Sequence, residues 1–134
     1  MEGLAAMALS KGGAVETARS LWQRQFQESN RADLKENARN HLLSLQTDEQ
    51  IWTLEFLLEK YRKKTGAFPD RLEAMVRAGL LRFVPLDPYG APYQYDSATG
   101  KVSLKPESKA RYIKIPYDYR PEFESQLAET YGPN

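Results

Sequence analysis

The chain has 134 residues, 41% of them hydrophobic, which is enough for one ordinary domain with its own core. Its 19 Lys and Arg against 18 Asp and Glu leave a formal net charge of +1. That balance argues against a nucleic-acid partner, because phosphate binding needs a basic excess. The absence of cysteine excludes disulfides, thiolate metal sites and cysteine nucleophiles.

The N-terminus opens on MEGLAAMAL, without the basic region of a signal peptide. Its apolar run is far shorter than the ~20 residues of a membrane-spanning helix, so no membrane insertion by this segment is expected. The abrupt opening fits either a native start or a start inside a longer protein, and both interpretations stay open.

The first 68 residues contain no proline, and their apolar periodicity predicts helices. The apolar pattern of residues 4–9 predicts a short helix, which is expected to end at Lys11-Gly12-Gly13. Thr47 and Gln50 form a capping-box pattern that starts a fourth helix at about residue 48, and Gly66 suits its end. The apolar faces of the three longer helices are Val15, Ala18, Trp22 and Phe26; Leu34, Ala38, Leu42 and Leu45; and Ile51, Leu54, Leu58 and Tyr61.

All eight prolines lie at or after Pro69, so the second half predicts short elements and turns. A short helix is expected after Pro69, and the apolar residues of 80–84, Phe83 among them, are expected to lead the chain back over the core. Residues 93–95 and 102–104 alternate like the strands of a hairpin, and residues 112–115 can add a third strand. A last helix opens at Pro121, with Phe123, Leu127 and Tyr131 facing inward.

These elements predict an α+β fold that is mainly α. It has four N-terminal helices, a short helix, a small two- to three-stranded antiparallel sheet and a C-terminal helix. We divide the chain into a helical, repeat-like segment, residues 1–47, and an α+β segment, residues 48–134, that shares one core with it.

Small residues at Ala6 and Ala18, followed by the aromatic Trp22, occur within Gly3–Asn30. This stretch resembles part of a tetratricopeptide repeat. The later helices do not continue the pattern, so the resemblance implies a terminal repeat of the kind that caps an array. Plain helical hairpins are the alternative interpretation.

A second resemblance rests on turn-forming residues between 51 and 104. They are Gly66-Ala67-Phe68-Pro69, Leu72, Gly79, Leu81, Pro85, Asp87-Pro88-Tyr89-Gly90, Tyr93 and Tyr95. Their order resembles the C-terminal half of the major pseudopilins of type II secretion systems. The resemblance implies a long helix, a short helix, a tight corner and a small sheet. It also implies a location in the cell envelope, and without it the cytoplasm is expected.

Two functions of that family are not carried over to this chain. Pseudopilins assemble through a very hydrophobic N-terminal helix, whereas the upstream helices here are amphipathic. The family also binds calcium in a loop after the hairpin, where residues 105–111 of this chain are basic overall. The resemblance therefore implies the scaffold alone, with no cofactor and no metal site.

The stretch VPLDPYGAPYQYD, residues 84–96, admits two interpretations. Asp87 before Pro88 is typical of a turn in which the carboxylate accepts backbone N–H groups, and Gly90 suits a positive φ, so we expect a structural corner. The alternative is an exposed aromatic platform for a peptide or sugar, made of Tyr89, Tyr93 and Tyr95.

A second aromatic cluster lies in YIKIPYDYRPEF, residues 112–123. One interpretation is that its tyrosines pack the C-terminal tail against the core. The other is that it binds a partner, because tyrosine and arginine are typical interface anchors. Its candidate residues are Tyr112, Tyr117, Tyr119 and Arg120.

No motif supplies a nucleophile, a base and an electrostatic stabiliser together, so no catalytic residue is assigned. His41, the only histidine, is expected to pack beside the helical face rather than to act as a base. The sequence predicts a non-catalytic protein-interaction or scaffold domain with a protein or peptide partner, as the C-terminal part of a longer helical-repeat protein. The alternative is a carbohydrate- or peptide-binding module, or an enzyme, that uses the tyrosine-rich second half.

Overall fold

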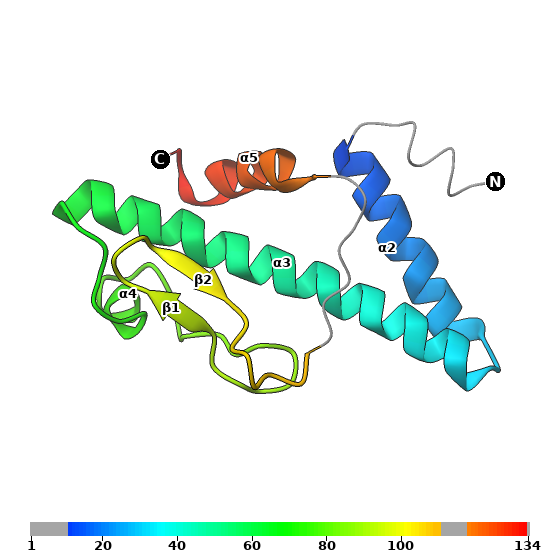
Figure 1. The fold of residues 1–134 in the computed structure, drawn as a ribbon. Coiled ribbons are helices and arrows are strands. Elements are labelled where there is room, and N and C mark those ends of the chain that lie inside the picture. Colours follow the sequence, from blue (N-terminus) through cyan, green and yellow to red (C-terminus); the bar gives the residue numbers. More distant parts are fainter. Residues whose placement is uncertain (1–10, 111–117, 134) are drawn as a thin grey trace.

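One long helix organises the fold in the computed structural model, which describes residues 11–110 and 118–133. Helix α3 (Ala32–Thr65) has 34 residues, and α2, α4, α5 and strand β2 all pack against it (Figure 1). The mainly helical α+β class that the sequence predicts is confirmed. The expected helix at residues 4–9 and the expected third strand at residues 112–115 lie outside the described residues.

Helix α2 (Lys11–Glu28) folds back on the N-terminal half of α3 as a helical hairpin. It includes Lys11, Gly12 and Gly13, so these residues do not form the helix-ending turn that the sequence predicts there; the helix that they were expected to close lies outside the described residues. Glycine weakens a helix by about 1 kcal/mol without forbidding it. Packing of the later turns on α3, where Val15 is buried with Leu45, compensates for that weakness.

Helix α3 replaces the two separate helices that the sequence predicts for residues 34–65. Thr47 does not cap a helix start. Its hydroxyl donates to the Leu43 carbonyl at 2.7 Å inside a continuous helix. A capping-box pattern marks a start only where the backbone leaves the helix, and no glycine or proline between residues 32 and 65 makes it do so. The helix ends, as expected, at Gly66.

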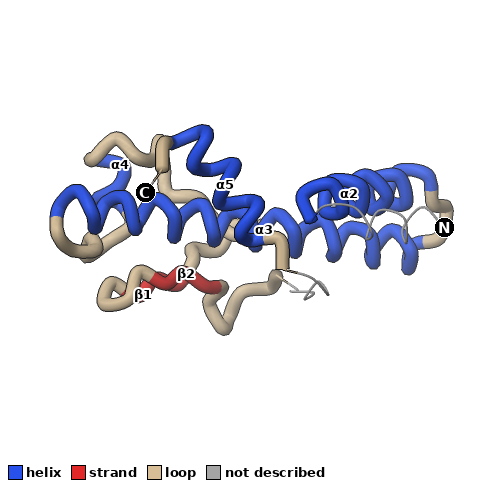
Figure 2. Tube along the Cα trace, turned by 90° about the horizontal axis from the view of Figure 1, so that it is seen from above, coloured by secondary structure: helices blue, strands red, loops and turns tan. Residues whose placement is uncertain are grey.

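The second half contains α4 (Glu73–Arg77), the antiparallel strands β1 (Gln94–Asp96) and β2 (Lys101–Ser103), and α5 (Arg120–Tyr131). In the view of Figure 2 the hairpin lies on one side of α3, and α4 and α5 lie on the other. Gly100 closes the hairpin with φ 72°, and a Cβ there would meet the Phe68 ring at 2.4 Å. Only glycine fits both the backbone conformation and the ring.

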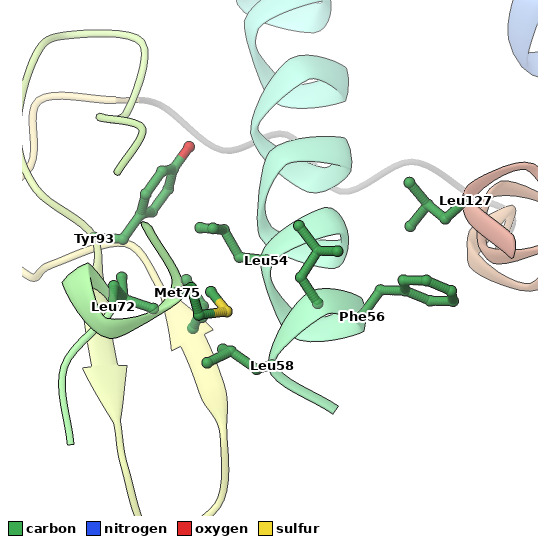
Figure 3. Close-up of a cluster of buried hydrophobic side chains, with 9 residues drawn as sticks. Leu54, Phe56, Leu58, Leu72, Met75, Tyr93 and Leu127 are labelled. Atoms are coloured by element: carbon green, nitrogen blue, oxygen red, sulfur yellow. The ribbon is translucent and has the colours of Figure 1, made fainter. Parts of the chain in front are cut away.

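The main core surrounds the C-terminal half of α3, because that stretch is apolar on several sides. Leu54 and Leu58 point toward α4 and the strands, whereas Phe56 points toward Leu127 of α5 (Figure 3). The buried partners from the other elements are Leu72, Met75, Tyr93 and Val102. Tyr131 was expected to face inward but is 43% exposed, because it lies in the last turn of α5.

A second, smaller cluster joins α2, α3 and the start of α5. It consists of Val15, Leu45 and Tyr119. Although α3 is long, neither it nor another helix in the described part of the chain is apolar enough to cross a membrane.

Candidate interaction surface

The corner after α4 is organised around the buried carboxylate of Asp87. Its Oδ1 accepts the backbone N–H groups of Tyr89 (2.8 Å) and Ala91 (3.0 Å), and its Oδ2 accepts the Ser108 hydroxyl (2.5 Å). Gly90 has φ 85°, a conformation that favours glycine. The structural interpretation of this corner is therefore confirmed.

These hydrogen bonds also set the ionisation of Asp87. Burial alone would raise the pKa of this carboxyl, but the donors from Ser108, Ala91, Tyr89 and Gly90 together lower it below its usual value. The carboxylate is thus held charged as part of the corner.

Two of the candidate tyrosines use their hydroxyls inside the fold. Tyr93 is buried and donates to the Gln50 side chain on α3. Tyr95 is half-buried and donates to the Pro69 carbonyl at 2.6 Å. Burial raises the pKa of both phenols. The strand therefore sends these rings toward the core, and Tyr89 is the more exposed member of the expected platform.

The second aromatic cluster is also tied to the core where it is described. Tyr119 is buried, and its ring meets Trp52 edge-on with centroids 4.7 Å apart. Its hydroxyl lies 3.4 Å from the Leu45 carbonyl. Tyr112 and Tyr117 lie outside the described residues.

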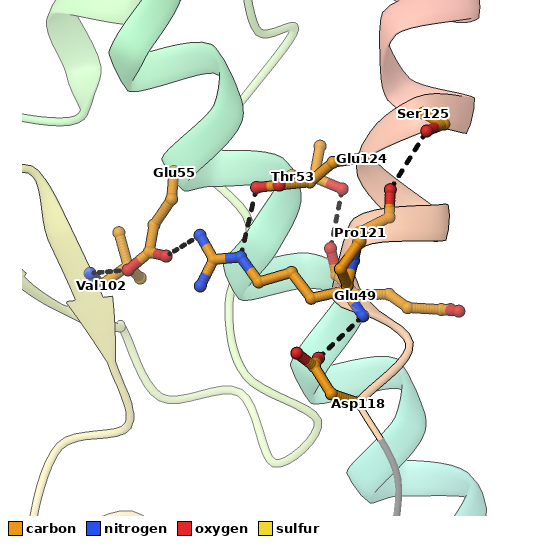
Figure 4. A network of polar contacts seen from close by, with 9 residues as sticks. Glu49, Thr53, Glu55, Val102, Asp118, Pro121, Glu124 and Ser125 are labelled. Carbon is orange, nitrogen blue, oxygen red and sulfur yellow. Dashed lines mark hydrogen bonds and ion pairs between the residues drawn. The ribbon is translucent and has the colours of Figure 1, made fainter. Parts of the chain in front are cut away.

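Arg120 links three elements rather than projecting freely into solvent. Its guanidinium donates to Glu55 of α3 (2.8 Å) and to Glu124 of α5 (3.2 Å). Glu55 in turn accepts the backbone N–H of Val102 in β2 at 2.9 Å. Figure 4 shows Glu55 beside Val102 of β2, and because Glu55 also pairs with Arg120, this network joins α5 and the sheet through α3.

The loop that follows α4 carries an exposed apolar surface, which we name loop 81–92. Phe83, Leu86 and Tyr89, three residues apart, are 69%, 49% and 38% exposed. The expectation that Phe83 covers the core is wrong. Leu80, Leu81 and Val84 pack against the core instead, and Phe83 points into solvent between them because the chain there forms no regular strand or helix.

The same loop forms one wall of a groove along α3, which we name the α3 groove. Its volume is about 280 Å³, and its apolar wall comes from Leu81 and Pro85. The exposed lining as a whole is mainly apolar, although α3 contributes several polar residue types to it. The residues of α3 that line it are Gln46, Glu49, Gln50, Thr53 and Leu54.

Glu49 in this groove is paired with Arg19 of α2, at 2.5 Å. Burial raises the pKa of the Glu49 carboxyl, and the neighbouring Arg19 only partly offsets that effect. Sequence reasoning missed this groove. The signal that was present is the run LLRFVPL, whose apolar residues exceed what one face of a short segment can bury.

The described residues offer little that resembles a reaction centre. The His41 ring stacks on Trp22 at 3.9 Å, and its Nδ1 lies 2.9 Å from the Asn37 carbonyl, so it packs in the α2–α3 hairpin as expected. Within residues 11–110 and 118–133, no three His, Cys, Asp or Glu side chains are grouped so that they could hold a metal ion.

No protein-family model, curated protein or solved structure matches this chain significantly. The resemblances to pseudopilins and to tetratricopeptide repeats therefore rest on the residue patterns of the sequence alone.

Proposed function

We propose that this chain is a non-catalytic protein-interaction domain that binds a segment of a partner protein on loop 81–92 and in the α3 groove beside it. The observation that carries the proposal is the exposure of Phe83 and Leu86 on the loop that walls the groove. Single exposed apolar residues are ordinary, but several on one loop beside a groove are typical of a binding surface.

The chemistry of the groove favours a peptide segment as its occupant. Leu81 and Pro85 offer an apolar wall, Leu54 of α3 adds to it, and Gln46 brings a polar side chain to the lining. A segment with apolar side chains can pack on the wall while its backbone groups bond to Gln46 or stay in contact with water. Burying Phe83 and Leu86 under such a segment stabilises the complex by roughly 1.5–3 kcal/mol for each fully buried side chain.

The sugar-binding or enzymatic alternative has less support. It needs exposed tyrosine rings beside converging carboxylates, and the hydroxyls of Tyr93 and Tyr95 are bonded within the chain.

The test compares two double variants, each of which replaces two exposed apolar side chains with serine. Phe83→Ser with Leu86→Ser removes the loop's apolar surface, and Phe26→Ser with Tyr131→Ser removes exposed aromatic surface elsewhere. Partners are captured by crosslinking to the wild-type chain, identified, purified and titrated against each variant. We expect the loop variant to bind at least about tenfold more weakly and the control to bind as wild type does. Equal binding by the loop variant would overturn the proposal.

A further inference from the structure

A second groove lies at the C-terminal end of α3, and we name it the lysine groove. It has a volume of about 420 Å³. Its lining residues are Lys60, Lys63, Lys64, Leu80 and Pro133. It shares no lining residue with the α3 groove, so an inference about it does not depend on the proposed function.

The three lysines of this groove have different roles. Lys60 Nζ donates to the carbonyl oxygens of Gly132 (3.2 Å) and Pro133 (3.4 Å), which holds the end of α5 against α3. Lys63 and Lys64 are exposed, and the described residues provide no ion-pair partner for either. The nearby acid, Glu59, is paired with Arg62.

The negative end of the helix dipole favours lysines in the last turn of α3. That interaction does not occupy their ammonium groups, which can still bind a ligand. Lys63 and Lys64, which have no ion-pair partner among the described residues, and the apolar surface of Leu80 and Pro133 together form an amphipathic hollow. The ligand with complementary chemistry carries carboxylates on both sides of an apolar side chain.

We propose that the lysine groove binds an acidic segment of a partner protein. One apolar side chain of that segment packs on Leu80 and Pro133, and the flanking carboxylates pair with Lys63 and Lys64. Phosphate-rich ligands fit less well, because the lining has no arginine fork and no aromatic ring for base stacking. The net charge of +1 also supplies no general attraction for nucleic acid.

The two grooves lie on the same face of α3. Gln46, Gln50, Thr53, Lys60 and Lys64 follow one another at steps of three, four and seven residues, which is the spacing of one helical face. Leu80 lines one groove and Leu81 the other. One partner protein can therefore contact both grooves, with its acidic segment toward the C-terminal end of α3.

The test uses a fluorescein-labelled nonapeptide with a central leucine flanked by glutamates, and the same peptide with glutamine in place of glutamate. Binding is measured by fluorescence anisotropy at low and high salt. Lys63→Gln with Lys64→Gln removes the proposed contacts. Lys101→Gln with Lys109→Gln, at two exposed lysines outside the groove lining, removes the same charge. We expect roughly tenfold or greater weakening for the groove variant, less than twofold for the control, and weaker binding at high salt.

A second measurement needs no variant. Mass spectrometry after brief acetylation should show that the glutamate peptide protects Lys63 and Lys64 but not Lys101 and Lys109. The proposal is overturned if both variants lose affinity equally, if the glutamine peptide binds as well, or if all four lysines are protected alike. It is also overturned if a single-stranded oligonucleotide or anionic phospholipid vesicles bind through these lysines and the glutamate peptide does not.

Discussion

At the scale of single residues, the corner at 87–91 shows how two residues hold a loop by different means. Gly90 adopts φ 85° in open space, so a side chain there would cost backbone strain rather than collide with a neighbour. Asp87 contributes a charge that several donors surround. The loop that carries Phe83 and Leu86 therefore begins from one packed anchor, the Leu80–Leu81 contact with the core, and ends at another, the corner.

The ionisation of Asp87 leads to a prediction about stability and pH. The carboxyl pKa is lower in the folded state than its ordinary value of 3.8, so the charged form stabilises the folded state at neutral pH. That contribution is fully present above the ordinary pKa and is lost as the pH falls below it toward the folded-state pKa.

Asp87→Asn should therefore lower the free energy of unfolding at pH 7 by about 1–3 kcal/mol, because the amide bonds the corner less well. Urea unfolding at pH 7, 5 and 3 should show the gap between wild type and variant narrowing at pH 3. The control is Asp70→Asn, at an exposed aspartate. A gap that stays constant with pH would show that charge at Asp87 does not matter.

At the scale of elements, the continuity of α3 is the feature on which the α3 groove depends. A break near residue 47 would turn the two halves of the helix relative to each other and move Gln46 away from Thr53. The continuous helix holds both on one wall of the groove.

Gln46→Pro tests that continuity. Proline inside a helix removes one hydrogen bond and clashes with the carbonyl four residues earlier, so unfolding should become easier by about 3 kcal/mol or more. Gln46→Ala, at the same exposed position, should change the free energy of unfolding by less than about 0.5 kcal/mol. A proline variant as stable as the alanine variant would mean that residue 46 lies in a linker.

At the scale of the whole molecule, α3 belongs to both apolar clusters. Leu45 packs in the smaller cluster with Tyr119, and Leu54 to Leu58 form the centre of the larger one. The loop at residues 29–31 separates α2 from α3, so the chain can be truncated there from the N-terminus without cutting α3.

Two truncated fragments test how much the N-terminal half of α3 contributes to stability. A fragment of residues 31–134 loses Val15 and the Arg19–Glu49 ion pair but keeps all of α3, so it should still unfold cooperatively, with a lower urea midpoint than the full chain. A fragment of residues 48–134 loses Leu45 and half of α3, and it should be clearly less stable than the longer fragment. Equal midpoints for the two fragments would show that residues 31–47 contribute nothing to the stability of the rest of the fold.

The sequence by itself determined the elements that local chemistry specifies. Proline and glycine positions marked the end of α3 at Gly66, the corner at Asp87 and Gly90, and the hairpin closed by Gly100, because these residues restrict φ and ψ wherever they stand. Apolar periodicity located most of the faces of α2, α3 and α5, since burial of a helix follows its 3.6-residue repeat. Phe26 and Tyr131, near the ends of α2 and α5, are the exceptions because both are exposed.

Only the tertiary structure decided between conformations that these local signals do not distinguish. Thr47 can cap a helix or lie inside one, and packing of α3 against elements on both sides favoured the continuous helix. Tyr93 and Tyr89 lie close together in the sequence, yet one is buried with its hydroxyl bonded to Gln50, and the other is partly exposed with its ring against Arg39. The orientation of Phe83, and with it the candidate surface, depends on how loop 81–92 meets α3. Contacts between residues distant in the chain set that arrangement, and no local pattern encodes them.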